Sequence, residues 1–255
     1  MPDRDSQSMY SPYLVDIDNQ LWVNQLYAQV YGEVINGYIR TNLRVQQFAL
    51  IGEELFILTL DGRVRHRDEY YNLPKIKKIL SVRTAIEALD VNGNVHIVGQ
   101  PGIIASNVDR LLVFDGVNTL YILKNGLVRC RSHTINLGNI INSKSKVLIN
   151  DSGDVMLVSY FNEMLSSRLI INDREVVDAV KYGTSVILLY RDHTLKLSNG
   201  KELEIDVIPK QFIILDESIL LEDINGDLYD YRWSGDRKKL ILWRLTLPAL
   251  LIEQL

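Results

Sequence analysis

Cysteine is nearly absent from this 255-residue chain, in which Cys130 is the sole example. One cysteine excludes an intramolecular disulfide and a zinc site built from several thiolates, and it suits a reducing compartment. The chain also lacks any run of about eighteen apolar residues, and residues 1–11 lack the apolar core of a signal peptide. We therefore expect a soluble intracellular protein, cytoplasmic or nuclear, that has no membrane-spanning segment.

An excess of positive charge is missing as well. The chain has 28 Lys and Arg against 32 Asp and Glu, which gives a formal net charge of −4. A nucleic-acid-binding protein is usually basic, so nucleic acid could bind here only through a local basic patch. An apolar fraction of 47% with 24% charged residues predicts a folded domain with a sizeable core.

The sequence contains no motif for metal binding or catalysis. The four histidines, at positions 66, 96, 133 and 193, are too far apart for an H-x-x-x-H motif. Cys130 lies between Arg129 and Arg131, which would lower the pKa of its thiol, but no partner base can be assigned to it. Acidic residues near the turns lack the spacing of a calcium loop. We predict no catalytic residue, no metal site and no cofactor.

What the chain does contain is a repeat. Seven short turn signatures, each with apolar residues on both sides, lie between 27 and 43 residues apart. The pairs are Asp18-Asn19, Asp61-Gly62, Asn92-Gly93, Asn125-Gly126, Ser152-Gly153, Asp192-His193 and Asn225-Gly226. Such pairs favour the positive φ angles of tight hairpin turns. Residues 57–65 alternate in polarity with the period of two that is typical of strands.

A further apolar segment precedes each of the later hairpins by 15 to 17 residues. These segments begin at Val45, Ile76, Val108, Leu137, Val177 and Pro209. Repeats of three or four short antiparallel strands are typical of the blades of a β-propeller. We predict an all-β fold, a single seven-bladed β-propeller over residues 12–255, with residues 1–11 as a flexible N-terminal tail.

The first repeat has no room for such a segment upstream of Asp18. The chain ends in the apolar residues 245–255, which follow the seventh hairpin. We expect this segment to complete the first blade, so that N- and C-terminal strands close the ring and no sheet edge stays open. The alternative is a short amphipathic helix packed on the last blade.

Residues 76–79 followed by Ala88-Leu89-Asp90-Val91-Asn92-Gly93-Asn94-Val95-His96-Ile97-Val98-Gly99 resemble a known unit. The unit is the repeat of the regulator of chromosome condensation family. The resemblance covers the hairpin half of the repeats, whereas the family's glycine-rich stretch after the hairpin is absent. It implies a seven-bladed propeller similar to the divergent copies in large DNA viruses of protists. Members of that family do not share one activity, so the resemblance implies a binding role and no specific reaction.

Two groups of residues are candidates for binding a partner. Arg63, Arg65 and Arg67 alternate along one predicted strand, with His66 among them and with Tyr70 and Tyr71 after them. Such a basic and aromatic patch suits an acidic protein surface or a phosphate backbone. The alternative is an outer strand that its charges keep soluble.

The second group lies in the insertion at residues 25–44. It contains Tyr27, Tyr31 and Tyr38 around an Asn36-Gly37 turn. Tyrosine is common in binding surfaces because it offers contact area at a small entropy cost. These tyrosines could equally belong to the outer strands of the first blade.

From these features we expect a non-catalytic scaffold that binds another macromolecule, most simply a protein, through loops on one face. Two alternatives stay open. One is an enzyme, a hydrolase or lyase, with an active site in the central channel. The other is a chromatin- or nucleic-acid-associated module that uses a local basic patch. The sequence does not indicate the partner's identity, the binding face or the oligomeric state.

Overall fold

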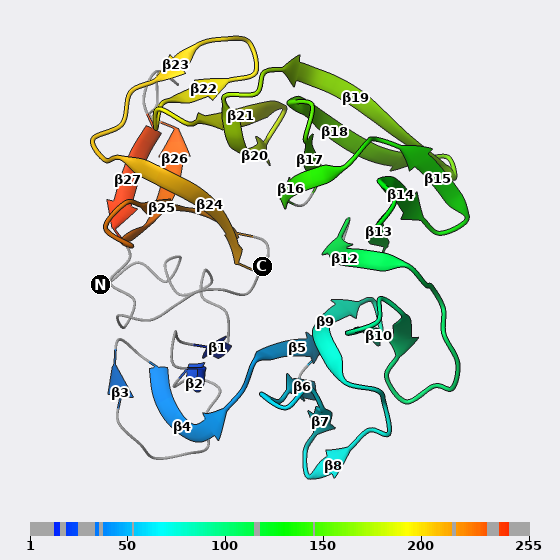
Figure 1. The fold of residues 1–255 in the computed structure, drawn as a ribbon. Helices are drawn as coiled ribbons and strands as arrows, with labels where there is room; N and C mark the ends of the chain where they lie inside the picture. The colour runs from blue at the N-terminus through cyan, green and yellow to red at the C-terminus, as the bar shows by residue number, and fades with distance from the viewer. Residues whose placement is uncertain are drawn as a thin grey trace.

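Every regular element of the structure is a β-strand, and the strands pair antiparallel (Figure 1). The computed structural model describes residues 13–15, 19–24, 34–35, 38–52, 54–114, 118–144, 146–215, 218–233 and 240–244. Within these ranges no helix occurs that is long and apolar enough to cross a membrane. The described strands form seven separate sheets, which are numbered in chain order below. The all-β prediction is therefore confirmed.

The first three sheets contain the strands up to residue 97. The first sheet has the order β1 (Tyr13–Val15), β2 (Gln20–Asn24), β4 (Tyr38–Arg44) and β3 (Val34–Ile35). The second consists of β5 (Gln47–Ile51), β6 (Glu54–Leu58), β7 (Val64–His66) and β8 (Glu69–Tyr70). The third consists of β9 (Ile76–Val82), β10 (Ala85–Asp90) and β11 (Val95–Ile97).

The four later sheets each contain four consecutive strands. The fourth sheet consists of β12 (Val108–Val113), β13 (Thr119–Leu123), β14 (Leu127–Cys130) and β15 (His133–Asn136). The fifth consists of β16 (Ile140–Lys144), β17 (Val147–Asn150), β18 (Asp154–Phe161) and β19 (Met164–Asn172). The sixth consists of β20 (Val176–Tyr182), β21 (Ser185–Tyr190), β22 (Leu195–Leu197) and β23 (Glu202–Leu203). The seventh consists of β24 (Pro209–Leu215), β25 (Ser218–Asp223), β26 (Leu228–Trp233) and β27 (Leu240–Arg244).

The sheets follow one another in chain order along a curved path, with their first strands toward its centre (Figure 1). Six of the predicted turn pairs join the second and third strands of sheets two to seven, as expected. Three predicted segment starts, Ile76, Val108 and Pro209, are the first residues of β9, β12 and β24. The prediction of Leu137 as a strand start was wrong, because β16 begins at Ile140; Leu137 is apolar because it is buried in the connection before that strand.

The core consists of layers of apolar side chains between neighbouring sheets. Between the second and third sheets, Leu58 and Val64 pack with Ile79 and Ala88, all of them fully buried. Between the fourth and fifth, Cys130 lies in the same cluster as Leu148. The Cys130 side chain is completely buried, which fits a structural role and not a reactive thiol.

The predicted closing segment, residues 245–255, and the predicted tail, residues 1–11, lie outside the described residues. Among the described strands, β1 pairs with β2 alone. The Asp18-Asn19 signature falls between β1 and β2, so these two strands correspond to the second and third strands of the other sheets. The edge of β1 is thus on the side where the other sheets have their first strand.

Candidate functional site

One face of the molecule carries all the turns between second and third strands. Because the strands of each sheet are antiparallel, this turn and the connection to the next sheet lie at the same end of the strands. Backbone hydrogen bonds join the two: Ile76 N–H donates to Gly62 O at 2.8 Å, and Val108 N–H donates to Gly93 O at 2.9 Å. We call this side the turn face. Among the described residues, the turns of the first six sheets contact the start of the following sheet.

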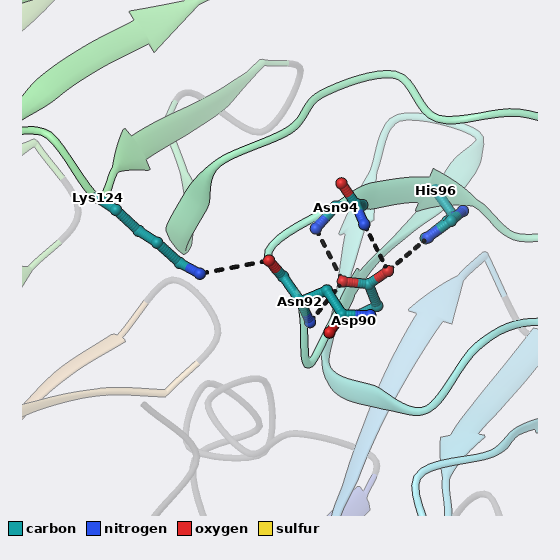
Figure 2. A network of polar contacts seen from close by, with 5 residues as sticks. All are labelled: Asp90, Asn92, Asn94, His96 and Lys124. Atoms are coloured by element: carbon teal, nitrogen blue, oxygen red, sulfur yellow. Dashed lines mark hydrogen bonds and ion pairs between the residues drawn. The ribbon is translucent and has the colours of Figure 1, made fainter.

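The turn of the third sheet is organised by one carboxylate (Figure 2). Asp90 Oδ1 accepts hydrogen bonds from Asn92 N at 2.9 Å and from Asn94 N at 2.8 Å. Asp90 Oδ2 lies 3.1 Å from both Asn94 Nδ2 and His96 Nε2, and Lys124 Nζ of the next sheet donates to Asn92 O at 3.3 Å. Burial raises the pKa of Asp90, but the hydrogen bonds from Asn94, His96 and Asn92 outweigh it, so the pKa lies below its usual value. The residues that carry the family resemblance therefore form a structural turn.

The same arrangement recurs in two other sheets. Asn150 Oδ1 accepts from Ser152 N at 3.1 Å and from Asp154 N at 2.8 Å. Asp223 Oδ1 accepts from Asn225 N and Asp227 N, both at 2.9 Å. The Asp and Asn residues at the turns thus cap backbone N–H groups, as their sequence positions suggested. Among the described residues, no group of three or more His, Cys, Asp or Glu is arranged to hold a metal ion.

The predicted basic patch lies at the outer edge of the second sheet, on β7, β8, the turn between them and the flanking residues Arg63 and Tyr71 (Figure 1). We call Arg63, Arg65, His66, Arg67, Tyr70 and Tyr71 the outer-edge cluster. The expectation that its three arginines share one strand is wrong: β7 spans Val64–His66, so Arg63 precedes it, and Arg67 has a φ of +54° in the turn that follows. The turn separates Arg67 from the other two arginines.

Arg63 and Arg65 both approach the exposed ring of Tyr70. The guanidinium carbon of Arg63 lies 4.2 Å from the ring centroid, and that of Arg65 lies 6.0 Å from it. Arg63 Nε also pairs with Asp61 at 2.7 Å, and Arg65 pairs with Asp68 at 2.8 Å. These contacts hold the two arginines against the aromatic ring.

The remaining members of the cluster group around Glu54 and Phe56. His66 Nε2 hydrogen-bonds to Glu54, and Arg67 pairs with the same carboxylate at 2.7 Å. These bonds, that of His66 first, lower the pKa of Glu54 despite its partial desolvation. The His66 ring stacks on Phe56 with centroids 4.6 Å apart, and Tyr71 stacks on the same ring at 6.2 Å.

Each arginine of the outer-edge cluster therefore faces a carboxylate. The positive charge that the sequence suggested is compensated by the neighbouring carboxylates of Asp61, Asp68 and Glu54. Compensated charge gives little attraction for a phosphate backbone, since such binding depends on releasing counterions. Tyr70 is 48% exposed, and the arginines lie beside it.

The second predicted group falls mostly outside the described residues, which include neither Tyr27 nor Tyr31. Tyr38 is the first residue of β4 and pairs with Ile35 of β3, so residues 36 and 37 connect these strands as predicted. Tyr38 thus belongs to an outer strand of the first sheet. Whether these three tyrosines bind a partner stays a prediction.

Residues that the sequence did not single out are exposed apolar side chains on the turn face. Leu60, Val91 and Ile224 each precede a turn pair and are 51%, 48% and 50% exposed. Ile208 lies just before β24, where Ile224 N–H donates to its carbonyl at 3.0 Å. Ile103 and Ile104 lie beside the start of β11, because Ile104 N–H donates to Val95 O. A sequence signal existed, since an apolar residue next to an exposed turn has no core to fill.

A row of polar side chains crosses the first strands. In β9, β12, β16, β20 and β24 the pairing with the second strand of the sheet shifts after the first residue, so that the second residue has no partner across the pair. The third residue of each of these strands is polar. With Gln47 of β5, the row is Gln47, Lys78, Arg110, Asn142, Asp178 and Gln211. We call it the first-strand row. The upstream segments predicted from the sequence contain this row, but without the register its members could not be aligned.

Members of the first-strand row bind the next sheet. Gln47 Oε1 accepts from Ile79 N at 3.0 Å, and Arg110 Nη2 donates to Ile140 O at 2.9 Å. Asp178 is almost completely buried, and its carboxylate accepts from Phe212 N at 2.7 Å. Burial raises the pKa of Asp178, although this bond and the charge of Lys144 oppose the rise. Four members of the row, Gln47, Arg110, Asn142 and Asp178, thus join successive sheets near their centre.

A second buried carboxyl group lies between the third and fourth sheets. Tyr121 Oη donates to Glu87, with both carboxylate oxygens 3.1 Å away. Both side chains are buried, and burial raises the pKa of Glu87. A raised pKa is a property of many catalytic acids. Glu87 and Tyr121 are each only 8% exposed, however, so the pair contributes to packing between sheets and offers little access to a substrate.

Comparison with known proteins identifies a fold and no family. No family model matches the chain. No curated protein matches it either. Solved structures do match: Hsv2 of Kluyveromyces lactis has a TM-score of 0.54 at 9% identity and covers 90% of this chain and 92% of its own. BamB of Moraxella catarrhalis has a TM-score of 0.50 at 11% identity, and the match covers 85% of this chain and 80% of BamB. The computationally designed Ika8 protein has a TM-score of 0.52 at 12% identity, and the match covers 92% of this chain and 84% of the designed one.

Hsv2 and BamB are β-propeller proteins, so the chain has a fold similar to theirs. Identities this low carry no function from one protein to another. The likeness agrees with the succession of small antiparallel sheets along a curved path (Figure 1).

Proposed function

We propose that this chain is a non-catalytic seven-bladed β-propeller that binds another protein through its turn face. The observation that carries the proposal is the group of exposed apolar side chains there: Leu60, Val91, Ile103, Ile104, Ile208 and Ile224. Exposed apolar side chains that gather on one face are typical of sites for protein partners. The turns that carry Leu60 and Val91 are held by hydrogen bonds to the following sheets, so little order must be gained there on binding.

Seven blades and a closed ring are part of the proposal. Seven sheets occur among the described residues, and the open edge of β1 is on the side where a first strand would pair. The apolar residues 245–255 would supply that strand. Membership of the regulator of chromosome condensation family rests on residues 88–99 and is proposed on that resemblance alone. An intracellular location rests on the sequence in the same way.

The outer-edge cluster would provide a second contact, through Tyr70 with Arg63 and Arg65, and Tyr27, Tyr31 and Tyr38 would extend it on the first sheet. Among the alternatives, the nucleic-acid module loses its main support because Arg63, Arg65 and Arg67 are paired with carboxylates. Salt-dependent retention on DNA that disappears when these arginines are changed to Glu would restore that alternative.

The proposal is tested by affinity purification of the full chain from its native host, followed by mass spectrometry. Val91→Asp and Ile224→Asp introduce a charge on the turn face, and we expect each to lose the partner that the unchanged protein retains. The matched controls are Phe161→Asp and Met164→Asp. In the unchanged protein Phe161 is 75% exposed and Met164 is 65% exposed, and both lie at the turn between β18 and β19.

That turn joins third and fourth strands, so it lies at the opposite end of the sheets from the turn face. We expect both control variants to retain the partner. Loss of the partner in the controls but not in the turn-face variants would assign binding to the opposite face. The absence of any stoichiometric protein partner would contradict the scaffold itself.

A further inference from the structure

The hairpin of β18 and β19 carries the most exposed apolar side chains in the described part of the chain. Phe161, Met164 and Leu169 have larger exposed fractions than any other large apolar residue there, and Leu169 is 57% exposed. Phe161 and Met164 oppose each other across a two-residue turn, in which Asn162 has a φ of +47° and Glu163 a φ of +61°. Positive φ at both positions is typical of a tight type I′ turn. The hairpin thus holds these side chains at the outer side of the fifth sheet (Figure 1).

β19 is also the longest described strand, and it lies at the edge of its sheet. It has nine residues, whereas the outer strands β8, β15 and β23 of the second, fourth and sixth sheets have two, four and two. Among the described residues it pairs with β18 alone. Proteins usually keep such edges short or place charges and prolines on them, because a long uncovered edge is a template for another strand. β19 contains no proline, and Arg168 is its one charged residue.

Three residues of β19 direct their backbone groups away from β18. The type I′ turn makes Phe161 and Met164 a hydrogen-bonded pair, and in an antiparallel ladder such pairs alternate with pairs whose backbone groups point outward. The pairing with β18 is regular from Met164 as far as Leu169. The residues with outward N–H and C=O groups are therefore Leu165, Ser167 and Leu169. No hydrogen bond from another described segment reaches these groups.

The sequence of this edge is symmetric about Ser167. Leu165 and Leu169 lie at equal distances on either side of it, and the three residues between them are polar. If two copies of β19 pair antiparallel about a two-fold axis at Ser167, each Leu165 faces Leu169 of the second copy. Ser167 then faces its own counterpart, and Arg168 faces Ser166 and not a like charge. Polar and apolar residues thus match along this edge, and the outward backbone groups of the two copies meet.

We propose that two copies of this chain form a symmetric dimer by pairing their β19 edges antiparallel about Ser167, so that the two fifth sheets become one continuous sheet. The pairing would satisfy the outward backbone groups and cover Leu169, and Phe161 and Met164 would lie beside the end of the second copy's strand. A strand of another protein could use the same backbone groups, but the symmetric sequence favours a second copy. The interface lies at the rim of the fifth sheet, so it is separate from protein binding at the turn face.

Sedimentation velocity of the full chain, over about a hundredfold range of concentration, measures the dimer directly. We expect the unchanged protein to shift from monomer to dimer as the concentration rises. Leu169→Asp places a charge opposite Leu165 in both halves of the interface. It should weaken the dimer by about a hundredfold, because the burial of one leucine counts for about tenfold and is lost twice.

Ile141→Asp is the matched control for Leu169→Asp. Ile141 is 55% exposed and lies on β16, the opposite edge strand of the same sheet. This variant should dimerise like the unchanged protein. Circular dichroism shows whether both variants fold.

Cysteine substitutions test the register without depending on a loss of affinity. Ser167→Cys puts two cysteines on the axis, where opposed Cα atoms are about 5.5 Å apart and a disulfide can form. Arg168→Cys is the matched control, because its two copies would lie diagonally, about 7 to 8 Å apart, too far for a disulfide. Cys130 is completely buried, so it does not compete. We expect oxidation to link Ser167→Cys into a dimer on a non-reducing gel and to leave Arg168→Cys monomeric.

A chain that stays monomeric at the highest concentration overturns the proposal and leaves the β19 edge to a strand of another protein. A dimer that Leu169→Asp does not weaken overturns it as well, because the interface then lies elsewhere. The register is wrong if Arg168→Cys cross-links as readily as Ser167→Cys, or if neither variant cross-links while the dimer forms.

Discussion

The contact between a turn and the following sheet is tested by replacing Gly93 with alanine. Gly93 has a φ of +92°, a conformation that costs a residue with a Cβ about 1 to 2 kcal/mol. A Cβ at this position would also lie 2.8 Å from Val108 O, a backbone atom at the start of β12. Relieving an overpacked contact of this kind costs about 1 to 3 kcal/mol more.

Comparison with Gly226→Ala separates the cost of the clash with Val108 O from the cost of the backbone conformation. Gly226 occupies the corresponding turn of the seventh sheet with a φ of +84°, and no described atom lies within 4 Å of the position that an alanine methyl group would take there. The two substitutions thus share the backbone strain, while the clash occurs at Gly93 alone. In a chain of this length about 1 kcal/mol shifts the melting temperature by roughly 2 to 4 °C.

We therefore expect Gly93→Ala to melt about 2 to 12 °C below Gly226→Ala, with both below the unchanged protein. Thermal unfolding followed by far-UV circular dichroism measures the difference, and urea unfolding at room temperature checks it. Equal losses for the two variants would show that the turn of the third sheet does not depend on its contact with the fourth, and the reasoning would be refuted.

Three further predictions concern the two carboxyl groups and the chain end. Asp90→Asn should lower the free energy of unfolding by about 1 to 2 kcal/mol at pH 7. Because hydrogen bonds hold the pKa of Asp90 below 3.8, the urea midpoints of the variant and of the unchanged protein should converge as the pH falls below that value. A gap between the midpoints that stays constant with pH would contradict this. Glu87→Gln should stabilise the protein by on the order of 1 kcal/mol at pH 7. Because burial raises the pKa of Glu87 above 4.5, this gain in stability should vanish below pH 4.5. A gain that persists in acid would show that the charge of Glu87 is not its cause. Deleting residues 247–255 should sharply lower the melting temperature or the solubility by exposing a sheet edge, and a truncated protein that melts like the full chain would refute the closure of the ring.

Much of the fold could be predicted because its signals are local. A turn pair such as Asn92-Gly93 depends on the conformations of a few residues, and the apolar residues beside it, such as Leu89 and Val95, reveal the period of a strand. The start of β16 was misplaced for the opposite reason: Leu137 is buried by the neighbouring sheet, and one sequence does not distinguish burial in a connection from burial in a strand.

The candidate sites were harder to predict because they depend on contacts between distant residues. The charges of Arg63, Arg65 and Arg67 were visible, but Glu54, which compensates Arg67, lies on another strand. The first-strand row required the register shift in each first strand, which places Lys78 and Arg110 at equivalent positions. The apolar residues of the turn face carry no signal in the sequence by themselves, because a single exposed Leu or Ile is common on protein surfaces. Their significance came from the shared face.

The hydrogen bonds on the turn face also have a consequence for how such a chain can change its length. Gly62 accepts from Ile76 of the following sheet, and Gly93 accepts from Val108 of the next, so each joint links a sheet to its successor. The stretch that begins just after Gly62 and ends at Gly93 contains Ile76, the donor of the first of these hydrogen bonds, and Gly93, the acceptor of the second. Duplicating or removing such a stretch would recreate complete joints on both sides, as in other proteins whose units contact only their neighbours. This directional linkage would let the number of sheets vary during evolution while every junction keeps the same chemistry.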